Sequence, residues 1–249
     1  MKQLLISLLT VGLATILSAS EPPKQVRPAA QPVVVLELFT SQGCSSCPPA
    51  DRALQDIIQQ ATRSGGTVYG LSFHVDYWNR LGWQDPFSTR QFTNRQRQYN
   101  QSLKTQTYTP QLIINGQQDV VGGQRSRIEQ TIQSVQKGPV SDFVGVDATL
   151  VRDPKQVTVR YTLSATGLHW VNVALVQKEA RTVVQSGENG GRTLVNTNVV
   201  RQFKTVDDSA LSGHVTLPLP TGLTADQTAV LVYVQRKDNG QIVGAKSVW

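Results

Sequence analysis

Cysteine is nearly absent from this chain of 249 residues, in which only Cys44 and Cys47 carry a thiol. Two thiols exclude a scaffold of several disulfides, and they exclude a zinc site built from four thiolates. Long runs of basic residues are also absent, because the 24 Lys and Arg residues that leave a formal net charge of +7 are scattered. A nucleic-acid-binding face clusters its basic residues, so the composition predicts no nucleic-acid partner.

No apolar run is long enough to span a membrane comfortably. The uncharged, mostly apolar residues 4–17 fall short of the ~20 residues that a spanning helix needs. This run follows Lys2 and precedes the small residues 18–20, which is the pattern of a secretory signal peptide. We therefore expect a signal peptide at 1–20, no stable membrane anchor after cleavage, and a bacterial periplasmic or secreted location, where disulfides persist.

The remaining chain divides by its hydrophobic pattern into a linker at 21–32 and two domains. In the first domain, at 33–138, strand-like runs alternate with helical periodicity. The expected order is a strand at 33–39, a helix at 48–61, a strand at 67–75, a helix at 87–103, a hairpin at 111–121 around Asn115-Gly116, and a helix at 127–136. Two strands joined through a helix pair in parallel by a right-handed crossover, so this domain is predicted to be α/β.

Helical periodicity disappears after Pro139. Short β-rich runs follow at 144–151, 157–163, 170–176, 195–200, 215–219, 230–234 and 242–243. Such spacing is typical of an antiparallel sandwich, so we expect an all-β antiparallel sandwich domain at 139–249.

The two thiols stand where the first predicted strand passes into the first predicted helix. Thiol–disulfide exchange needs one thiolate to attack and a second thiol to resolve the mixed disulfide. Cys44 is expected at the exposed amino end of the helix, where free N–H groups and the helix dipole favour a thiolate, and Cys47 one turn deeper. The pair therefore predicts redox chemistry without an organic cofactor, although metal binding and a structural disulfide use the same spacing.

Thr109 and Pro110 precede the predicted hairpin. Proline belongs at the start of a strand because it cannot donate to a sheet ladder. In thioredoxin-like proteins a cis-proline at this place lies beside the thiol pair, and the preceding residue pairs with a bound peptide. The segment TPQLIING at 109–116 resembles that family segment. Together, the two motifs are far more specific than either alone.

A narrower resemblance rests on LELFTSQGCSSCPPAD at 36–51, on FHVDYW at 73–78 and on YTPQ at 108–111, with further matches at 187–192 and 198–201. These segments resemble a family of secreted bacterial thioredoxin-like proteins known as domain of unknown function 1223. The resemblance implies an α/β thioredoxin-like domain followed by the all-β sandwich domain. It implies that Cys44 attacks or is attacked, that Cys47 resolves, and that Thr109 and Pro110 position the partner. The partners would be protein or peptide thiols or disulfides and a second redox protein, with reductase, oxidase and isomerase roles all compatible.

Several polar or aromatic residues are candidates for supporting roles. Glu37 lies seven residues before Cys44, whereas the buried proton-transfer acid of thioredoxins lies six before, so Glu37 is either such an acid or a structural one on the other face. His74, Asp76 and Trp78 follow the second strand, at the sheet edge where sites gather. His74 either adjusts the reactivity of Cys44 or is a buried structural histidine. Asp76 is a candidate to support the residues that contact the thiols. Trp78 is a candidate to form part of an apolar rim that binds a peptide.

A glycine-rich connection holds further polar residues, namely Glu188, Asn189, Arg192 and Asn196. Such a loop is either a simple turn or a segment that folds against the thiols and defines what reaches Cys44, with Arg192 as the residue to test. Two rival functions remain open. One is a copper metallochaperone that uses Cys44, Cys47 and His74, since soft thiolates select Cu(I). The other is a non-catalytic binding protein with a structural disulfide.

Overall fold

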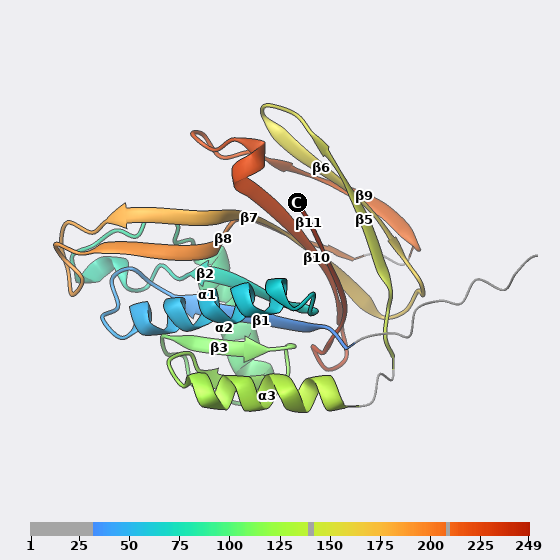
Figure 1. Ribbon diagram of the computed structural model, residues 1–249, viewed down its shortest axis with the longest axis horizontal. Coiled ribbons are helices and arrows are strands. Elements are labelled where there is room, and N and C mark those ends of the chain that lie inside the picture. The colour runs from blue at the N-terminus through green and yellow to red at the C-terminus, as the bar shows by residue number, and fades with distance from the viewer. Residues whose placement is uncertain (1–31, 139–141, 208–209) are drawn as a thin grey trace, which may run out of the picture.

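The computed structural model describes residues 32–138, 142–207 and 210–249 (Figure 1). The predicted signal peptide and nearly all of the predicted linker lie outside these ranges. The described helices are α1 at Cys47–Arg63, α2 at Arg90–Leu103 and α3 at Arg125–Lys137, with short 3₁₀ helices η1 at Asn79–Leu81 and η2 at Ala225–Gln227. Within the described ranges, none of the helices has the length and apolar character needed to cross a bilayer.

Most of the described chain forms strands. In chain order they are β1 Val34–Thr40, β2 Val68–His74, β3 Gln111–Ile114, β4 Gln118–Val121, β5 Val146–Arg152, β6 Gln156–Leu163, β7 His169–Val183, β8 Thr193–Asp207, β9 Ser212–Pro218, β10 Thr228–Arg236 and β11 Ile242–Val248. The predicted strands and helices therefore exist, most with bounds shifted by a few residues, but β7 and β8 each continue seven residues beyond the ends predicted at 176 and 200. The parallel pairing of β1 with β2 and the β3–β4 hairpin are confirmed.

The predicted fold class is wrong. Instead of a thioredoxin-like domain followed by a separate sandwich, the protein is mostly β, and one mixed sheet of eight strands in the order β11-β10-β7-β8-β2-β1-β3-β4 runs through both halves. A second sheet holds only β5, β6 and β9. The two predicted units therefore share one sheet, and the all-β half does not pack as an independent body.

The junction between the two halves of the large sheet is short. Strand β8 joins β2 through the single pair Ser72–Val199. Side chains strengthen it, since Ser72 Oγ donates to the carbonyl of Thr197 at 2.9 Å and Asn198 Nδ2 donates to the carbonyl of Gly70 at 3.0 Å. Because these contacts link residues more than a hundred positions apart, no local pattern in the sequence announces them.

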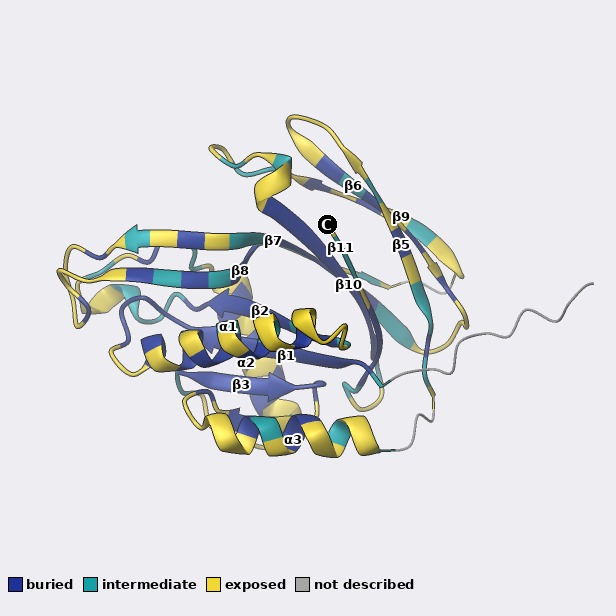
Figure 2. Ribbon diagram, in the orientation of Figure 1, coloured by how far each residue is buried: buried dark blue, intermediate teal, exposed yellow. Residues whose placement is uncertain are grey.

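Three apolar clusters divide the molecule into layers (Figures 1 and 2). Helices α1 and α3 cover one face of the β1–β3 region, where Val34, Leu36 and Leu38 point. Helix α2 and the neighbouring long strands cover the opposite face, where Val35 and Phe39 point. The three-stranded sheet packs on the β7, β10 and β11 part of the large sheet. Successive residues of β1 therefore point alternately to the face covered by α1 and α3 and to the face covered by α2.

Candidate functional site

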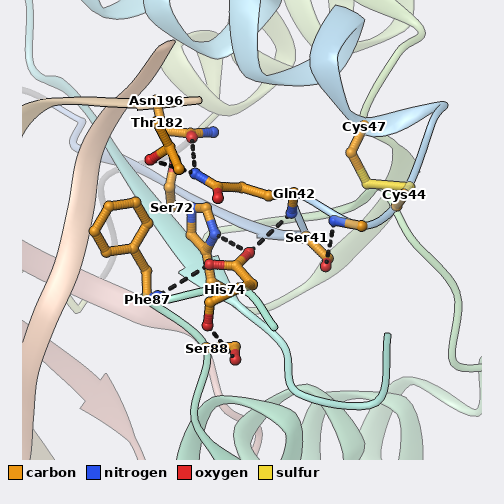
Figure 3. Close-up of polar contacts among 12 residues, drawn as sticks. Ser41, Gln42, Cys44, Cys47, Ser72, His74, Phe87, Ser88, Thr182 and Asn196 are labelled. Atoms are coloured by element: carbon orange, nitrogen blue, oxygen red, sulfur yellow. Dashed lines mark hydrogen bonds and ion pairs between the residues drawn. A yellow bond between two sulfur atoms is a disulfide. The ribbon is translucent and has the colours of Figure 1, made fainter. Parts of the chain in front are cut away.

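Cys44 and Cys47 form a disulfide at the junction between β1 and α1 (Figure 3). Cys47 is the first residue of α1, and Pro48 and Pro49 occupy the next positions. Proline is tolerated there because the first helical N–H groups have no partner within the helix. The Cys47 N–H donates to the Cys44 carbonyl at 3.2 Å, which closes a turn around the two sulfur atoms.

The expectation of an exposed Cys44 is wrong, because both cysteines have an exposed fraction of 0%. Cys44 lies in the turn before the helix, and its Sγ is 3.3 Å from Ser46 Oγ. An external thiolate needs direct access to one sulfur along the S–S axis. Direct attack on either sulfur would therefore require a neighbouring segment to move aside.

Residues 186–192, which we name the cover loop, join β7 to β8 and lie on the thiol turn. Asn189 is fully buried, and its Nδ2 donates to the carbonyls of Gln42 and Cys44, both at 2.9 Å. Glu188 Oε2 accepts a 2.9 Å hydrogen bond from the Ser45 N–H, and hydrogen bonding by the side chain and the backbone of Ser45 lowers the pKa of Glu188. The glycine-rich connection thus folds against the thiols rather than forming an isolated turn.

Other contacts hold the cover loop in shape. Arg192 NH1 donates to Asn189 Oδ1 at 2.9 Å, so Arg192 acts on the thiol turn by orienting Asn189. Ser186 Oγ donates to the carbonyl of Gly82. Gly187 adopts φ +74°, and a Cβ there would lie 3.3 Å from Trp83 Cβ. A side chain at position 187 is therefore disfavoured by conformation and by space.

Gln42 is the residue that ties the thiol turn to its surroundings (Figure 3). Its Nε2 donates to Thr182 Oγ1 at 3.0 Å and to Asn196 Oδ1 at 3.1 Å, at the end of the β7–β8 hairpin. Its Oε1 accepts from Trp83 Nε1 at 3.2 Å, and its backbone N–H donates to Asp85 Oδ2 at 2.8 Å. Since Asn189 also uses the Gln42 carbonyl, hairpin, cover loop and thiol turn meet at one buried residue.

The predicted peptide-positioning residues lie near the thiol turn. The Thr109–Pro110 bond is cis, as the family resemblance implied. Trp78 Nε1 donates to Thr109 Oγ1 at 2.7 Å, and Trp78 Cβ would be 3.4 Å from a Cβ at Gly43. Trp78 therefore spans from the residue before Cys44 to the residue before the cis-proline.

Pro110 itself packs beside the start of α1. A Cβ built at Gly122 would lie 3.1 Å from the Cβ atoms of both Ala50 and Pro110, so these two side chains border the same small space. Ala50 is three residues after Cys47, in the first turn of α1. The cis-proline and the disulfide thus flank the same helical turn.

Glu37 is a structural acid on the other face of β1, the second of the two roles that the sequence left open. It points to the α2 face of β1 and accepts hydrogen bonds from Arg95 Nε and NH2, each at 2.7 Å. The hydroxyls of Tyr99 and Tyr233 donate to the same carboxylate at 2.9 and 3.0 Å. These four bonds satisfy a buried charge, and they hold Glu37 on the face of β1 opposite to α1.

His74 and Asp85 form a buried ion pair, with Nδ1 and Oδ2 2.7 Å apart and both side chains at 0% exposure. Burial favours neutral imidazole, but the Asp85 carboxylate outweighs it and raises the pKa of His74. Burial likewise opposes the charge of Asp85, yet His74 and the Gln42 and Phe87 N–H groups lower its pKa. His74 is therefore bound to Asp85, at the edge of the sheet from which the thiol turn leaves.

Asp76 serves a different element. Thr93 Oγ1 donates to Asp76 Oδ1 at 2.6 Å, which ties the segment after β2 to α2. The ligand set of the copper alternative, Cys44, Cys47 and His74, is not brought together as such: among the described residues, no group of three or more His, Cys, Asp and Glu side chains is arranged to hold a metal ion.

Sequence reasoning missed Gln42, Asp51, Asp85 and Arg95. A signal existed for Asp51, which follows Cys47 by four residues on a helix and so shares its face. Asp85 and Arg95 lie in polar segments whose partners come from β2 and β1, and no local spacing marks them. Gln42 lies next to the thiol motif but carries no chemistry of its own, so only its contacts reveal its role.

Comparison with known proteins places the whole described site within one family. The model of a family described as "Protein of unknown function (DUF1223)" matches residues 35–235. An X-ray crystal structure of an Agrobacterium tumefaciens protein is 32% identical with a TM-score of 0.68, covering 88% of this chain and 96% of that chain. HBP35 of Porphyromonas gingivalis, at 15% identity and TM-score 0.64, covers 89% of this chain and 76% of that one and shows a similar fold. No curated protein matches the chain.

Proposed function

The chain belongs to the DUF1223 family, and we propose that it is a thiol–disulfide oxidoreductase whose Cys44–Cys47 pair is masked by the cover loop. The observation that carries the proposal is the shared helical turn, with the disulfide at its start and the cis-Thr109–Pro110 segment beside it. A disulfide that only staples a loop needs no such neighbour. The geometry supports an acceptor for a peptide strand next to a reactive sulfur.

The chemistry uses the protein's own sulfur atoms. A partner thiolate attacks Cys44 Sγ, the Cys44–Cys47 bond breaks, and its electron pair leaves on Cys47, which takes up a proton. The partner's second thiol then releases Cys44, so that the partner ends as a disulfide and this protein as a dithiol. The reverse sequence oxidises a partner dithiol. Cys44 is the attacked atom in this proposal because it precedes α1, whereas Cys47 belongs to the helix.

The cover loop sets access. Its displacement breaks the two Asn189 bonds and the Glu188 bond, and it frees the Ser45 N–H at the amino end of α1. Ordinary hydrogen bonds contribute about 0.5–1.5 kcal/mol each. The binding free energy of a partner that docks beside Trp78 can therefore offset the loss of the loop contacts. In this proposal small thiols and disulfides react only during spontaneous opening of the loop, whereas a protein or peptide partner displaces the loop as it binds.

Compartment and partner complete the proposal. The amino-terminal pattern favours export to a bacterial periplasm or the outside, where a second redox protein would restore the starting form. A catalyst of this kind cycles between two states, so its partners comprise both a substrate and a regenerating protein.

Complete burial of both cysteines favours a second candidate function, in which the disulfide is structural and the protein is a non-catalytic binding protein. The two candidates differ in what the folded protein does with an external disulfide. A structural pair reacts only through global unfolding, whereas a masked active pair reacts through movement of one loop.

The discriminating experiment uses the folded Cys47→Ser and Cys44→Ser variants with glutathione disulfide. We expect a mixed disulfide on Cys44 in Cys47→Ser, at a rate insensitive to low concentrations of denaturant, and a much slower reaction on Cys47 in Cys44→Ser. Equal rates for both variants that rise with denaturant in step with unfolding would contradict the proposal and support the structural disulfide. Circular dichroism of both variants verifies the fold.

A further inference from the structure

Three buried polar atoms belong to residues around one point behind the thiol turn and have no hydrogen-bond partner in the part of the chain that the structure describes. They are Thr40 Oγ1 at the end of β1, His74 Nε2 at the end of β2 and Asp51 Oδ1 on α1. Thr40 and His74 have an exposed fraction of 0%, and Asp51 of 6%. A buried polar atom without a well-aligned hydrogen bond costs up to about 1–3 kcal/mol. The Thr40 hydroxyl and the Asn196 amide stand close enough to the Asp51 carboxyl to lower its pKa, and His74 acts on it as well, so these side chains form one electrostatically coupled cluster.

The position of Asp51 relative to Cys47 is fixed by the helix. Residues four apart lie on the same face, and helical side chains point back toward the preceding turn. The Asp51 carboxyl therefore lies over the turn that holds Cys47, on the buried side of α1. Asp51 is the acid of α1 that is buried, since Asp56 faces solvent and pairs with Arg125.

The surroundings of Asp51 hold it between two charge states. Burial raises its pKa to about 6, and the neighbouring His74 opposes that rise while Asp85 adds to it. On the other side of Asp51, a cavity of about 310 Å³ between α1 and the hairpin brings Arg52, Glu179 and Arg181 near. Arg201 is a further cation that faces His74. A carboxyl in this setting can gain or lose a proton near neutral pH.

A proton acceptor is needed at Cys47 because this sulfur is fully buried. When Cys47 attacks a mixed disulfide on Cys44, its thiol must give up a proton. When the Cys44–Cys47 bond is broken, the departing Cys47 thiolate must gain one. Water does not reach a side chain with no exposed surface, so the proton has to move to or from a neighbouring group.

We infer that Asp51 exchanges this proton with Cys47, and that the His74–Asp85 pair positions Asp51 and balances its charge. The inference rests on the proposed oxidoreductase function. In the resolving direction the Cys47 proton moves to the Asp51 carboxylate as the new S–S bond forms and the partner sulfur leaves as a thiolate. In the opposite direction the Asp51 carboxyl protonates Cys47 as the S–S bond breaks. The cavity beside Asp51 gives the proton a route to solvent.

The test follows the reaction of the reduced, folded protein with Ellman's reagent by stopped flow from pH 5 to 9. The first release of thionitrobenzoate reports attack by Cys44, and the second reports resolution by Cys47. For Asp51→Asn we expect an unchanged first release and a second release at least tenfold slower near pH 7, recovering as hydroxide takes over at high pH. Asp56→Asn, which removes an exposed carboxylate from the same helix, should match the wild type in both phases.

The outcomes separate the inference from the proposed function. If Asp51→Asn changed neither the rate nor the pH profile of the second release by more than twofold, the inference would be overturned and the oxidoreductase proposal would stand. If the folded wild type released no thionitrobenzoate at all, the proposed function itself would fail.

A second measurement needs no variant. Carboxyl-carbon NMR of the wild type, with aspartate labelled, should show one buried carboxyl that titrates near pH 6 in the oxidised protein and shifts its midpoint on reduction. A midpoint that is the same in both redox states would overturn the inference, because coupled proton transfer requires the two sites to sense each other.

Discussion

Asn189 donates a 2.9 Å hydrogen bond from its side-chain amide to the carbonyl oxygen of Cys44, 145 residues earlier in the chain. The same nitrogen donates to Gln42, and Arg192 holds the amide from the other side. One side chain of the cover loop thus binds the backbone of the thiol turn at two points. This contact links the β-rich half of the chain to the disulfide.

Asn189→Ala should unmask the disulfide. Loss of two buried hydrogen bonds destabilises the closed loop by about 1–3 kcal/mol, which corresponds to a rise of about 5-fold to 150-fold in the rate of reduction by dithiothreitol. The rate is measured by alkylation and mass spectrometry under native conditions. Asn239→Ala, in an exposed turn, is the matched control and should react like the wild type. An Asn189→Ala rate equal to that control would show that the loop does not limit access.

Acid should loosen the same loop through Glu188. The hydrogen bonds from Ser45 favour the carboxylate and lower the pKa of Glu188, so this contact is present above that pKa and is lost as pH falls through it. Reduction by a phosphine, which works in acid, should accelerate below about pH 4.5 in the wild type more than in Glu188→Gln. If the two proteins had parallel pH profiles, protonation of Glu188 would not control opening of the cover loop.

Glu37→Gln should destabilise the fold and leave thiol chemistry alone. The substitution leaves Arg95 as a buried charge without its partner, which costs about 3–5 kcal/mol. Urea unfolding measures this loss, and the double variant Glu37→Gln with Arg95→Met should recover part of it. The folded fraction should release thiols with an unchanged rate from pH 6 to 9. A changed pH profile there would restore Glu37 as a proton-transfer acid.

The stability of the oxidised protein should carry the signature of Asp51. Its pKa is raised to about 6 in the folded state, so the folded protein holds a proton that the unfolded chain releases near pH 4. Stability therefore falls as pH rises through this window, by up to about 3 kcal/mol. Asp51→Asn should exceed the wild type in stability at pH 7 and approach it below pH 4. Equal stabilities across the range would place Asp51 in a solvated environment.

Local patterns predicted the elements of this fold but not its architecture. The apolar run at 33–39 became β1, and Asn115 and Gly116 formed the β3–β4 turn with positive φ at both residues. The single Ser72–Val199 pair, in contrast, merges two expected domains into one sheet. Pairings between distant strands depend on edges and faces that exist only after folding, so the fold class was wrong although its strands were present.

The candidate site likewise contains features that the sequence predicted and features that it did not. The spacing of Cys44 and Cys47, the segment at Thr109–Pro110 and the glycine-rich connection were visible in the sequence, because each is a short motif. Their burial was not visible, since the cover loop that contacts the thiol turn belongs to the other half of the chain. The one-residue offset of Glu37 did carry information: period-two alternation put it on the α2 face.

Redox titration of the folded wild-type protein tests the central claim most directly. The protein is equilibrated in buffers that contain dithiothreitol and oxidised dithiothreitol. Its free thiols are then trapped by alkylation and counted by mass spectrometry, while near-ultraviolet circular dichroism follows the fold. The account predicts a reversible two-electron curve for Cys44 and Cys47 with native circular dichroism at every point. Reduction that occurs only together with loss of the native spectrum would contradict it and leave a structural disulfide.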